Sequence, residues 1–396
     1  MSVTEKMILR GARLILPDRL SEKASLLIDN GRVASIIEGG GAVPVGPMQS
    51  IDLDGLTLFP GFIDLHIHGA MGVDTMEAGA DDLHRVSRFL GAKGVTSWLP
   101  TLVPAPAKDY ERAVGAIKTA INQQADGEAA ARVLGVHYEG PFVSTAQCGA
   151  LRSNYFRAFT DIKELETLAV LEGPTATRMM TMAPEIEGGI DLVRELVYRG
   201  WIVSIGHTRA TPDVLDLARK AGAHHMTHFM NAMSPLHHRK PGPVGWGLVN
   251  DDVTCDVIAD GVHVDPLMLE LLLRCKTAER VALISDAVAP AGLGDGDYKV
   301  WGETITVRDG RTSNQRGSIA GSVITMLDAV RMMLSRGVTA VDVARMASTN
   351  PARVLGSESE LGSIEEGKRA DLVALDDAGN VHLTIVGGRV AFEGRD

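Results

Sequence analysis

Apolar and polar residues alternate in short stretches at both ends of the chain, which is the pattern of half-buried β-strands. The turn Asn30-Gly31 indicates a hairpin within the first set. The stretches are residues 7–16, 24–29, 32–37 and 51–58 near one end, and 371–375, 381–386 and 389–392 near the other. Because both ends share this pattern, we expect residues 1–59 and 357–396 to build one small β-sandwich domain.

The middle of the chain, residues 60–356, instead alternates apolar strands with helical patterns. Amphipathic helices over residues 191–199 and 212–221 each end at a glycine. Eight strands are expected at 62–67, 96–100, 133–138, 179–183, 202–205, 224–227, 255–258 and 281–284. Eight β-then-α units predict an α/β fold of the (β/α)8 TIM-barrel type, with its chemistry at the C-terminal ends of the strands. A doubly wound sheet is the alternative, although no Gly-x-Gly-x-x-Gly motif opens a helix after the first strand.

Charge and cysteine content limit the partners and the compartment. The formal net charge of −11 over 396 residues argues against nucleic acid or an anionic membrane as a partner, so an anionic substrate needs a local basic group. Cys148, Cys255 and Cys275 are an odd number without metal-site spacing, which indicates a reduced, cytoplasmic setting. We find no apolar signal-peptide core near the N-terminus and no run of the ~18 apolar residues that span a membrane.

The first strand of the middle region ends in two histidines, His66 and His68. Residues two apart on a β-strand point to the same face, so these side chains project together. Neutral imidazoles placed in this way can share one divalent metal ion. Taken alone, the pair is equally compatible with two buried histidines that hydrogen-bond to the backbone.

Five further strand ends carry residues of the same kind. They are His137 with Glu139, His207, His228, Asp260 with His263, and Asp286. A single histidine of this kind is more often structural than a metal ligand. Six strand ends out of eight are hard to explain by packing, and such a ring of nitrogen and oxygen ligands suits Zn²⁺ or a similar divalent ion.

Several short motifs follow one another at these strand ends. They are Glu139-Gly-Pro-Phe, Gly206-His207-Thr208, Thr227-His228-x-x-Asn231-Ala-Met, Pro241-Gly-Pro-Val-Gly, Asp260-Gly-Val-His263 and Ser285-Asp286-Ala. Together with His66-Ile-His68 they resemble the amidohydrolase superfamily and, within it, the N-acetylglucosamine-6-phosphate deacetylase family. The resemblance implies a metal-dependent hydrolase barrel that converts N-acetyl-D-glucosamine 6-phosphate to D-glucosamine 6-phosphate and acetate in amino-sugar catabolism.

The resemblance also implies roles in binding metal. Glu139, His207 and His228 would hold the catalytic ion, and His66 and His68 would hold a second ion bridged through Glu139. We expect one or two ions per subunit, Zn²⁺ first, with Fe²⁺, Mn²⁺ or Co²⁺ as alternatives. Other amidohydrolases bridge two metals with a lysine on the fourth strand, but residues 179–183 contain none, which fits a bridging glutamate.

In the same resemblance, Asp286 is the general base that takes the proton of the attacking water and the acid that returns it to the leaving amine. His263 would polarise the amide carbonyl and stabilise the oxyanion. His137 shares the strand phase of Glu139, so it either orients a ligand or fills the core.

For the substrate, the resemblance places Asn231 and the Ala232 backbone near the phosphate. Arg239 would bind that phosphate from a neighbouring subunit, which implies a homodimer. The remaining substrate contacts implied by the family pattern are Ala150, Leu151, Asp260, His263, Ile319, Ala320 and Gly321.

The loop over residues 147–151 departs from the family pattern. Gln147 and Leu151 stand where the family has a basic residue and a sugar-facing histidine, and Cys148 beside them is interpreted as incidental. Lost polar contacts leave another substrate open, either N-acetylgalactosamine 6-phosphate or an unphosphorylated N-acyl amino sugar. A non-catalytic scaffold with this fold is the remaining alternative, and the retained ligand-type residues and Asp286 argue against it.

Overall fold

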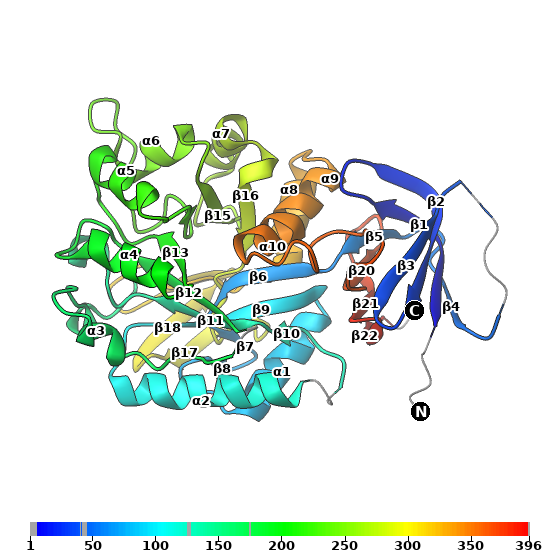
Figure 1. Cartoon of the computed structure of the whole chain (residues 1–396), viewed down its shortest axis with the longest axis horizontal. Coiled ribbons are helices and arrows are strands. Elements are labelled where there is room, and N and C mark those ends of the chain that lie inside the picture. The colour runs from blue at the N-terminus through cyan, green and yellow to red at the C-terminus, as the bar shows by residue number, and fades with distance from the viewer. Residues whose placement is uncertain (1–5, 40, 42–45, 125–127, 174–175, 395–396) are drawn as a thin grey trace.

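The computed structural model describes residues 6–39, 41, 46–124, 128–173 and 176–394, and their middle part forms a barrel of parallel strands (Figure 1). The barrel strands are β6 (Phe62–Ile67), β9 (Val95–Leu102), β10 (Arg132–Val133), β11 (Gly135–Glu139), β12 (Thr177–Met182), β13 (Ile202–Ile205), β14 (His225–Met226), β15 (Thr254–Ile258) and β16 (Val281–Ile284). β6 lies beside β9, and from β9 to β16 neighbouring strands follow the order of the sequence. The eight predicted strands are confirmed, with β10 and β11 together forming the third.

Hydrogen bonds between β6 and the end of β16 bring the first and last strands together. The backbone N–H of Asp286 donates to the carbonyl of His66 at 2.9 Å, and that of His68 donates to the carbonyl of Ala287 at 2.8 Å. Gly69 follows at once, and a Cβ there would lie 1.9 Å from the carbonyl oxygen of Val73. The chain therefore needs glycine directly after the histidine pair, where two backbones approach closely.

Helices cover the outside of the barrel (Figure 1). Those between the strands are α1 (Ala80–Gly91), α2 (Ala107–Gln123), α3 (Lys163–Glu166), α4 (Gly189–Tyr198), α5 (Pro212–Lys220), α6 (Gly242–Val249) and α7 (Pro266–Lys276). After β16 come α8 (Met326–Ser335), α9 (Ala340–Ala344) and α10 (Asn350–Val354). The two amphipathic helices expected from the sequence are α4 and α5, and each buries one apolar face, with Leu192, Val193 and Leu196 in α4 and Leu215 and Ala218 in α5.

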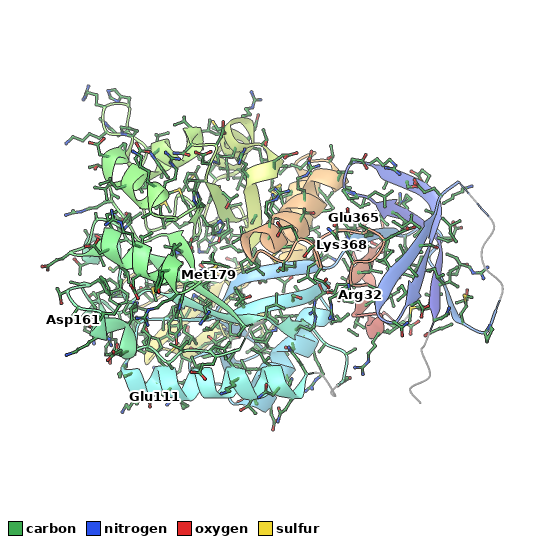
Figure 2. The ribbon with its side chains drawn as sticks, viewed as in Figure 1. Arg32, Glu111, Asp161, Met179, Glu365 and Lys368 are labelled. Carbon is green, nitrogen blue, oxygen red and sulfur yellow. The ribbon has the colours of Figure 1, made fainter. Side chains whose placement is uncertain are left out.

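The barrel interior is filled by apolar side chains rather than forming a channel. Met179 lies inside it (Figure 2) and packs in one cluster with Ile63, Leu99, Ile258 and Ile284, all of them buried. Charged side chains such as Glu111 and Asp161 lie at the surface in the same view. A filled interior leaves only the barrel mouth for chemistry, as in other barrels of this type.

Strands from the two ends of the chain form a separate sheet beside the barrel (Figure 1). Its strands are β1 (Met7–Ile15), β2 (Leu20–Asp29), β3 (Arg32–Ile37), β4 (Gln49–Asp52), β5 (Thr57–Pro60), β20 (Leu372–Leu375), β21 (Val381–Val386) and β22 (Arg389–Glu393). β20 pairs antiparallel with β5, which joins the two ends, and inward side chains of both ends share one core. The exact domain limits at 59 and 357 stay a prediction, and residues 1–5 and 395–396 lie outside the described part.

One element was not expected from the sequence. A small antiparallel sheet, β17 (Gly296–Val300), β18 (Glu303–Arg308) and β19 (Arg311–Ser313), is inserted between β16 and α8. Its second turn, Asp309-Gly310, has positive φ angles of 50° and 71° and is the hairpin signal that could have revealed it. A short pair of strands, β7 (Gly69–Ala70) and β8 (Val73–Asp74), follows the histidine pair.

Among the described residues, no helix is long and apolar enough to cross a membrane.

A buried ion pair connects the barrel to the small domain. Nη2 of Arg132, on β10, lies 2.5 Å from Oδ2 of Asp371, whose other oxygen accepts the backbone N–H of Gly387 at 2.6 Å. Only 5% of the Asp371 side chain is exposed. Removal of one partner from such a pair leaves the other charge buried and unpaired, which is strongly destabilising.

We therefore expect Asp371→Ala to lower the free energy of unfolding by about 3 kcal/mol, measured by urea denaturation followed by circular dichroism. The matched control is Asp377→Ala. Asp377 pairs with Arg13 at 2.5 Å, but its side chain is 84% exposed, so its loss should cost less than about 1 kcal/mol. Equal effects of the two substitutions would contradict a special role for the buried pair.

Candidate active site

Sharp turns at the strand ends aim the candidate side chains into the barrel mouth. His207 after β13, His228 after β14 and Asp286 after β16 have φ angles of 47°, 33° and 49°. Left-handed backbone is unfavourable for such residues and persists where the surrounding structure enforces it, often at functional sites. The three turns place side chains from separate strands around one point.

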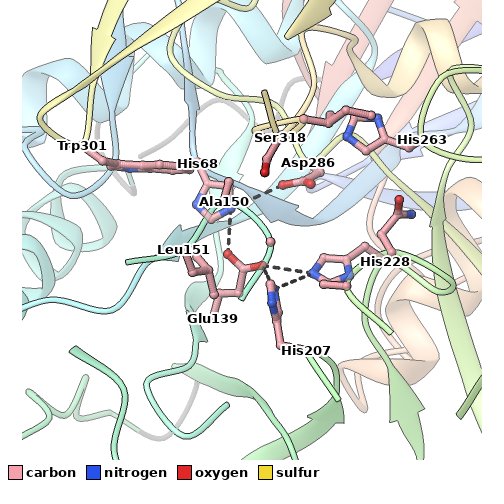
Figure 3. A pocket seen from close by; sticks show the side chains of 15 residues that line it. His68, Glu139, Ala150, Leu151, His207, His228, His263, Asp286, Trp301 and Ser318 are labelled. Atoms are coloured by element: carbon pink, nitrogen blue, oxygen red, sulfur yellow. Dashed lines mark hydrogen bonds and ion pairs between the residues drawn. The ribbon is translucent and has the colours of Figure 1, made fainter. Parts of the chain in front are cut away.

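Glu139 lies at that point, with four histidines around its carboxylate, of which Figure 3 shows His68, His207 and His228. Its Oε1 is 2.8 Å from Nε2 of His207 and 3.0 Å from Nε2 of His228. Its Oε2 is 3.2 Å from Nε2 of His68, and its Oε1 is 3.8 Å from Nε2 of His66. Glu139 thus belongs to two groups of residues that could each hold a metal ion, one with His66 and His68 and one with His207 and His228.

The donor atoms of this cluster fit divalent metal ions. Within each histidine pair the Nε2 atoms face each other, at 3.1 Å for His66 and His68 and at 3.2 Å for His207 and His228. A cation is the partner that imidazole lone pairs and a carboxylate have in common. Nitrogen and carboxylate oxygen donors are those preferred by Zn²⁺ and similar ions.

The carboxylate of Glu139 and the imidazoles around it shift one another's pKa values. Burial lowers the pKa of the His66 imidazole well below its usual value, so this ring is neutral. Burial alone would raise the pKa of Glu139, but the four imidazoles around it hold that pKa well below its usual range. Burial opposes a charge on His68 and His228, but hydrogen bonds to Asp286 and Glu139 raise the pKa of His68 to about 10, and the hydrogen bond to Glu139 raises that of His228 to about 9. Neutral imidazole and ionised carboxylate are the forms that bind a metal, so metal binding at these two rings releases protons.

Backbone carbonyls orient two of the histidine rings. Nδ1 of His207 is 2.8 Å from the carbonyl oxygen of Gln147, and Nδ1 of His68 is 3.3 Å from that of Thr101. A hydrogen on Nδ1 that is donated to a carbonyl leaves Nε2 as the free lone pair facing the centre. The loop over residues 147–151, which differs from the family pattern, therefore orients His207 through a backbone carbonyl. This contact does not depend on which side chain stands at position 147.

Two buried aspartates that were not predicted from the sequence form hydrogen bonds beside His228 and Asp286. Asp256, on β15, accepts the backbone N–H of His228 and lies 2.9 Å from Nε2 of His225. Asp64, on β6, accepts the hydroxyl of Ser285 at 2.6 Å, next to Asp286. The sequence signal that could have identified them is an aspartate inside an otherwise apolar strand. Buried carboxylates are rare unless they are paired, so such an aspartate is expected to have a specific partner.

Asp286 and His263 lie across the pocket from Glu139 (Figure 3). Oδ1 of Asp286 is 3.4 Å from Nε2 of both His66 and His68. His263 is held by Asp260, whose Oδ2 is 2.7 Å from its Nδ1. His137 lies below the site, where its Nδ1 is 2.9 Å from the carbonyl of Leu65 and its Nε2 is 2.8 Å from the hydroxyl of Thr181.

The barrel mouth contains a pocket of about 250 Å³ in which most of the predicted residues meet. The predicted residues that line it are His68, Glu139, Ala150, Leu151, His207, His228, Asn231, Ala232, His263, Asp286, Ile319 and Gly321. Gly149, Trp301 and Ser318 also line it and were not expected. Nothing local in the sequence singled out Trp301, which reaches the site from the inserted sheet.

The other predicted residues lie outside this lining. His66 is fully buried beside His68, and Ala320 is fully buried next to Ile319. Asp260 reaches the pocket only through His263. Arg239 is exposed on the segment before α6 and does not line the pocket of its own chain.

Comparisons with known proteins agree with this geometry. The amidohydrolase family model matches residues 57–391. The chain belongs to the amidohydrolase family. It is 36% identical to the N-acetylgalactosamine-6-phosphate deacetylase of Escherichia coli O157:H7, over 97% of this chain and 99% of that protein. It is 34% identical to the N-acetylglucosamine-6-phosphate deacetylase of Bacillus subtilis strain 168, over 98% of each.

A solved amidohydrolase structure confirms the fold. The crystal structure of N-acetylglucosamine-6-phosphate deacetylase from Pasteurella multocida superposes with a TM-score of 0.89 at 31% identity, covering 97% of this chain and 99% of that one. The predicted barrel class and the resemblance to this deacetylase family are both confirmed. The roles of individual residues stay predictions.

Glu139 belongs to both groups of candidate metal ligands, so a substitution at this residue tests for a metal centre. We expect Glu139→Gln to weaken metal binding by about 100-fold or more, because a neutral amide removes the charge common to both groups of ligands. Metal per subunit is measured by mass spectrometry, and affinity by competition with a chelator.

The control for this test is Glu185→Gln. Glu185 lies at the same barrel mouth but accepts hydrogen bonds from the Thr208 hydroxyl and the Arg209 backbone, outside the histidine cluster. Its metal content should equal that of the unmodified protein. Full metal content in Glu139→Gln would contradict a metal centre at Glu139.

Proposed function

We propose that this protein is a metal-dependent deacetylase that hydrolyses N-acetyl-D-glucosamine 6-phosphate to D-glucosamine 6-phosphate and acetate. The observation that carries the proposal is the convergence of Glu139, His207 and His228 with Asp286 in one pocket. The names of the similar proteins, which are amino-sugar 6-phosphate deacetylases, supply the substrate class. A scaffold without activity has no need of this buried ligand set.

We assign the catalytic ion, Zn²⁺ by preference, to Glu139, His207 and His228, and a second ion to His66, His68 and Glu139. When bound, such an ion supplies Lewis acidity that lowers the pKa of water and polarises a carbonyl oxygen. Glu139 and the histidines fix the position at which that chemistry occurs. The surrounding buried strands exclude bulk water and so strengthen the electrostatic interactions there.

Asp286 transfers the proton in this proposal. Its carboxylate takes a proton from the attacking water and delivers it to the nitrogen of the leaving amine. His263 faces the same pocket and donates to the oxygen on which negative charge develops. Asp260 orients this imidazole by binding its Nδ1, so that Nε2 faces the substrate.

The phosphate end of the substrate is assigned to the side of Asn231 and Ala232. Nδ2 of Asn231 is buried without a hydrogen-bond partner among the described residues, as expected for a group that awaits a ligand. Arg239 is exposed and outside its own pocket, which fits a guanidinium that binds the phosphate of a partner subunit. A homodimer is therefore part of the proposal.

N-acetylgalactosamine 6-phosphate is the second candidate substrate. It is favoured by the E. coli relative at 36% identity and by Leu151, a buried apolar residue in the pocket lining that stands where the family pattern has a sugar-facing histidine. A hydroxyl that loses its hydrogen-bond partner is recognised less strictly.

Substrate profiling tests the proposal. We expect N-acetylglucosamine 6-phosphate to have the highest kcat/KM, and the unphosphorylated sugar to fall at least about 100-fold below it, because the charge-assisted phosphate contacts are lost. The galactosamine epimer is measured alongside. A higher kcat/KM for the epimer would move the assignment to the second candidate, and turnover of neither phosphate would refute the proposal.

The role of Asp286 gives a separate prediction. Asp286→Asn should lower kcat by about 10²- to 10⁴-fold, since an amide cannot accept the proton of water, while the melting temperature and metal content stay unchanged. Because Oδ1 lies 3.4 Å from two imidazoles, metal analysis distinguishes a base from a ligand. Loss of one ion per subunit would assign Asp286 to metal binding instead.

A further inference from the structure

Trp301 reaches the active site from the inserted sheet. Its ring meets that of His68 edge to face, with centroids 5.2 Å apart and planes at 83°. It lines the same pocket as Leu151, and Figure 3 shows both on the side of His68, across Glu139 from His228. The side of the pocket next to His68 is therefore walled by large apolar side chains.

The backbone at Trp301 is strained in a way that presents this ring. Trp301 and Gly302 form the two-residue turn between β17 and β18, with φ angles of 53° and 77°. Such a turn favours asparagine or glycine, and a bulky residue in left-handed backbone is unusual. Strain of this kind at a pocket points to a function for the side chain.

The orientation of the substrate in the pocket rests on the proposed function. The order of groups in the substrate is phosphate, sugar, nitrogen, carbonyl carbon and acyl tail. Asn231, at the phosphate end, follows His228 and donates its backbone N–H to the His228 carbonyl at 2.8 Å. The proposed function places the reacting carbon between Glu139 and Asp286, and in that placement the acyl tail extends away from His228 and toward Trp301.

We infer that Trp301, together with Leu151, is the wall that limits the acyl group to acetyl. The wall acts by shape, because Nε1 of Trp301 is buried and has no hydrogen-bond partner among the described residues. Leu151 is 3% exposed and cannot move aside without disturbing the barrel core in which it packs. Discrimination by one methylene in an apolar pocket reaches about 10- to 200-fold.

The test compares kcat/KM for the N-acetyl, N-propionyl and N-butyryl derivatives of glucosamine 6-phosphate. All three release the same amine, so one assay serves the series. The wild type should prefer acetyl to butyryl by about 100-fold or more. Trp301→Asn should reduce that preference at least tenfold, and its melting temperature should be retained because asparagine suits the left-handed turn.

Tyr298→Ala is the matched control on the same hairpin. Tyr298 packs within the inserted sheet and hydrogen-bonds to the Gly294 carbonyl at 3.0 Å, but it does not line the pocket, so the acyl preference should stay unchanged. An unchanged acetyl-to-butyryl ratio in Trp301→Asn would overturn the inference, as would equal loss of all three activities. If the wild type prefers the galactosamine epimer, the series is made on that sugar.

Failure of the inference is distinguishable from failure of the proposed function. Acetyl turnover by the wild type with an unaltered acyl ratio in the variant rejects only the wall. No turnover of either N-acetylhexosamine 6-phosphate by the wild type rejects both.

Discussion

The active site depends on one buried carboxylate, Glu139, that four imidazoles share. Burial of an ionised group is costly unless partners surround it, and here His66, His68, His207 and His228 do so from three other strands. Those partners converge only if the C-terminal ends of parallel strands meet at one end of a closed barrel. The cluster of candidate metal ligands therefore exists only when the barrel has closed.

Closure of the barrel determines where the remaining groups lie. The bond from the Asp286 backbone to the His66 carbonyl joins the last strand to the first and brings Asp286 to the histidine pair. Gly69 permits the close backbone approach beside it. The strained turns at His207, His228 and Asp286 lie above tightly packed strands, and such a rigid core can maintain an unfavourable backbone geometry.

Much of the site could be predicted because strand periodicity is a local property. Residues two apart on a β-strand point to the same face, so His66 and His68 could be paired from their spacing alone. The C-terminal ends of parallel strands meet at one edge, so the sequence alone groups Glu139, His207, His228 and Asp286. Asp64 and Asp256 were not predicted because they act by accepting backbone N–H groups of Ser285 and His228. These partners come from other strands, so no local sequence pattern reveals them.

The sequence by itself determined the order of strands, the division between barrel and terminal sheet, and the metal-type residues at the strand ends, because each follows from hydrophobic period and residue chemistry within a short window. Only the tertiary structure decided which side chains touch. It brought Trp301 onto His68, buried Ala320 and His66 behind the lining, and left Arg239 on the surface. Such contacts join residues far apart in the chain, and they exist only once the barrel has closed and its inserted sheet has folded over the mouth.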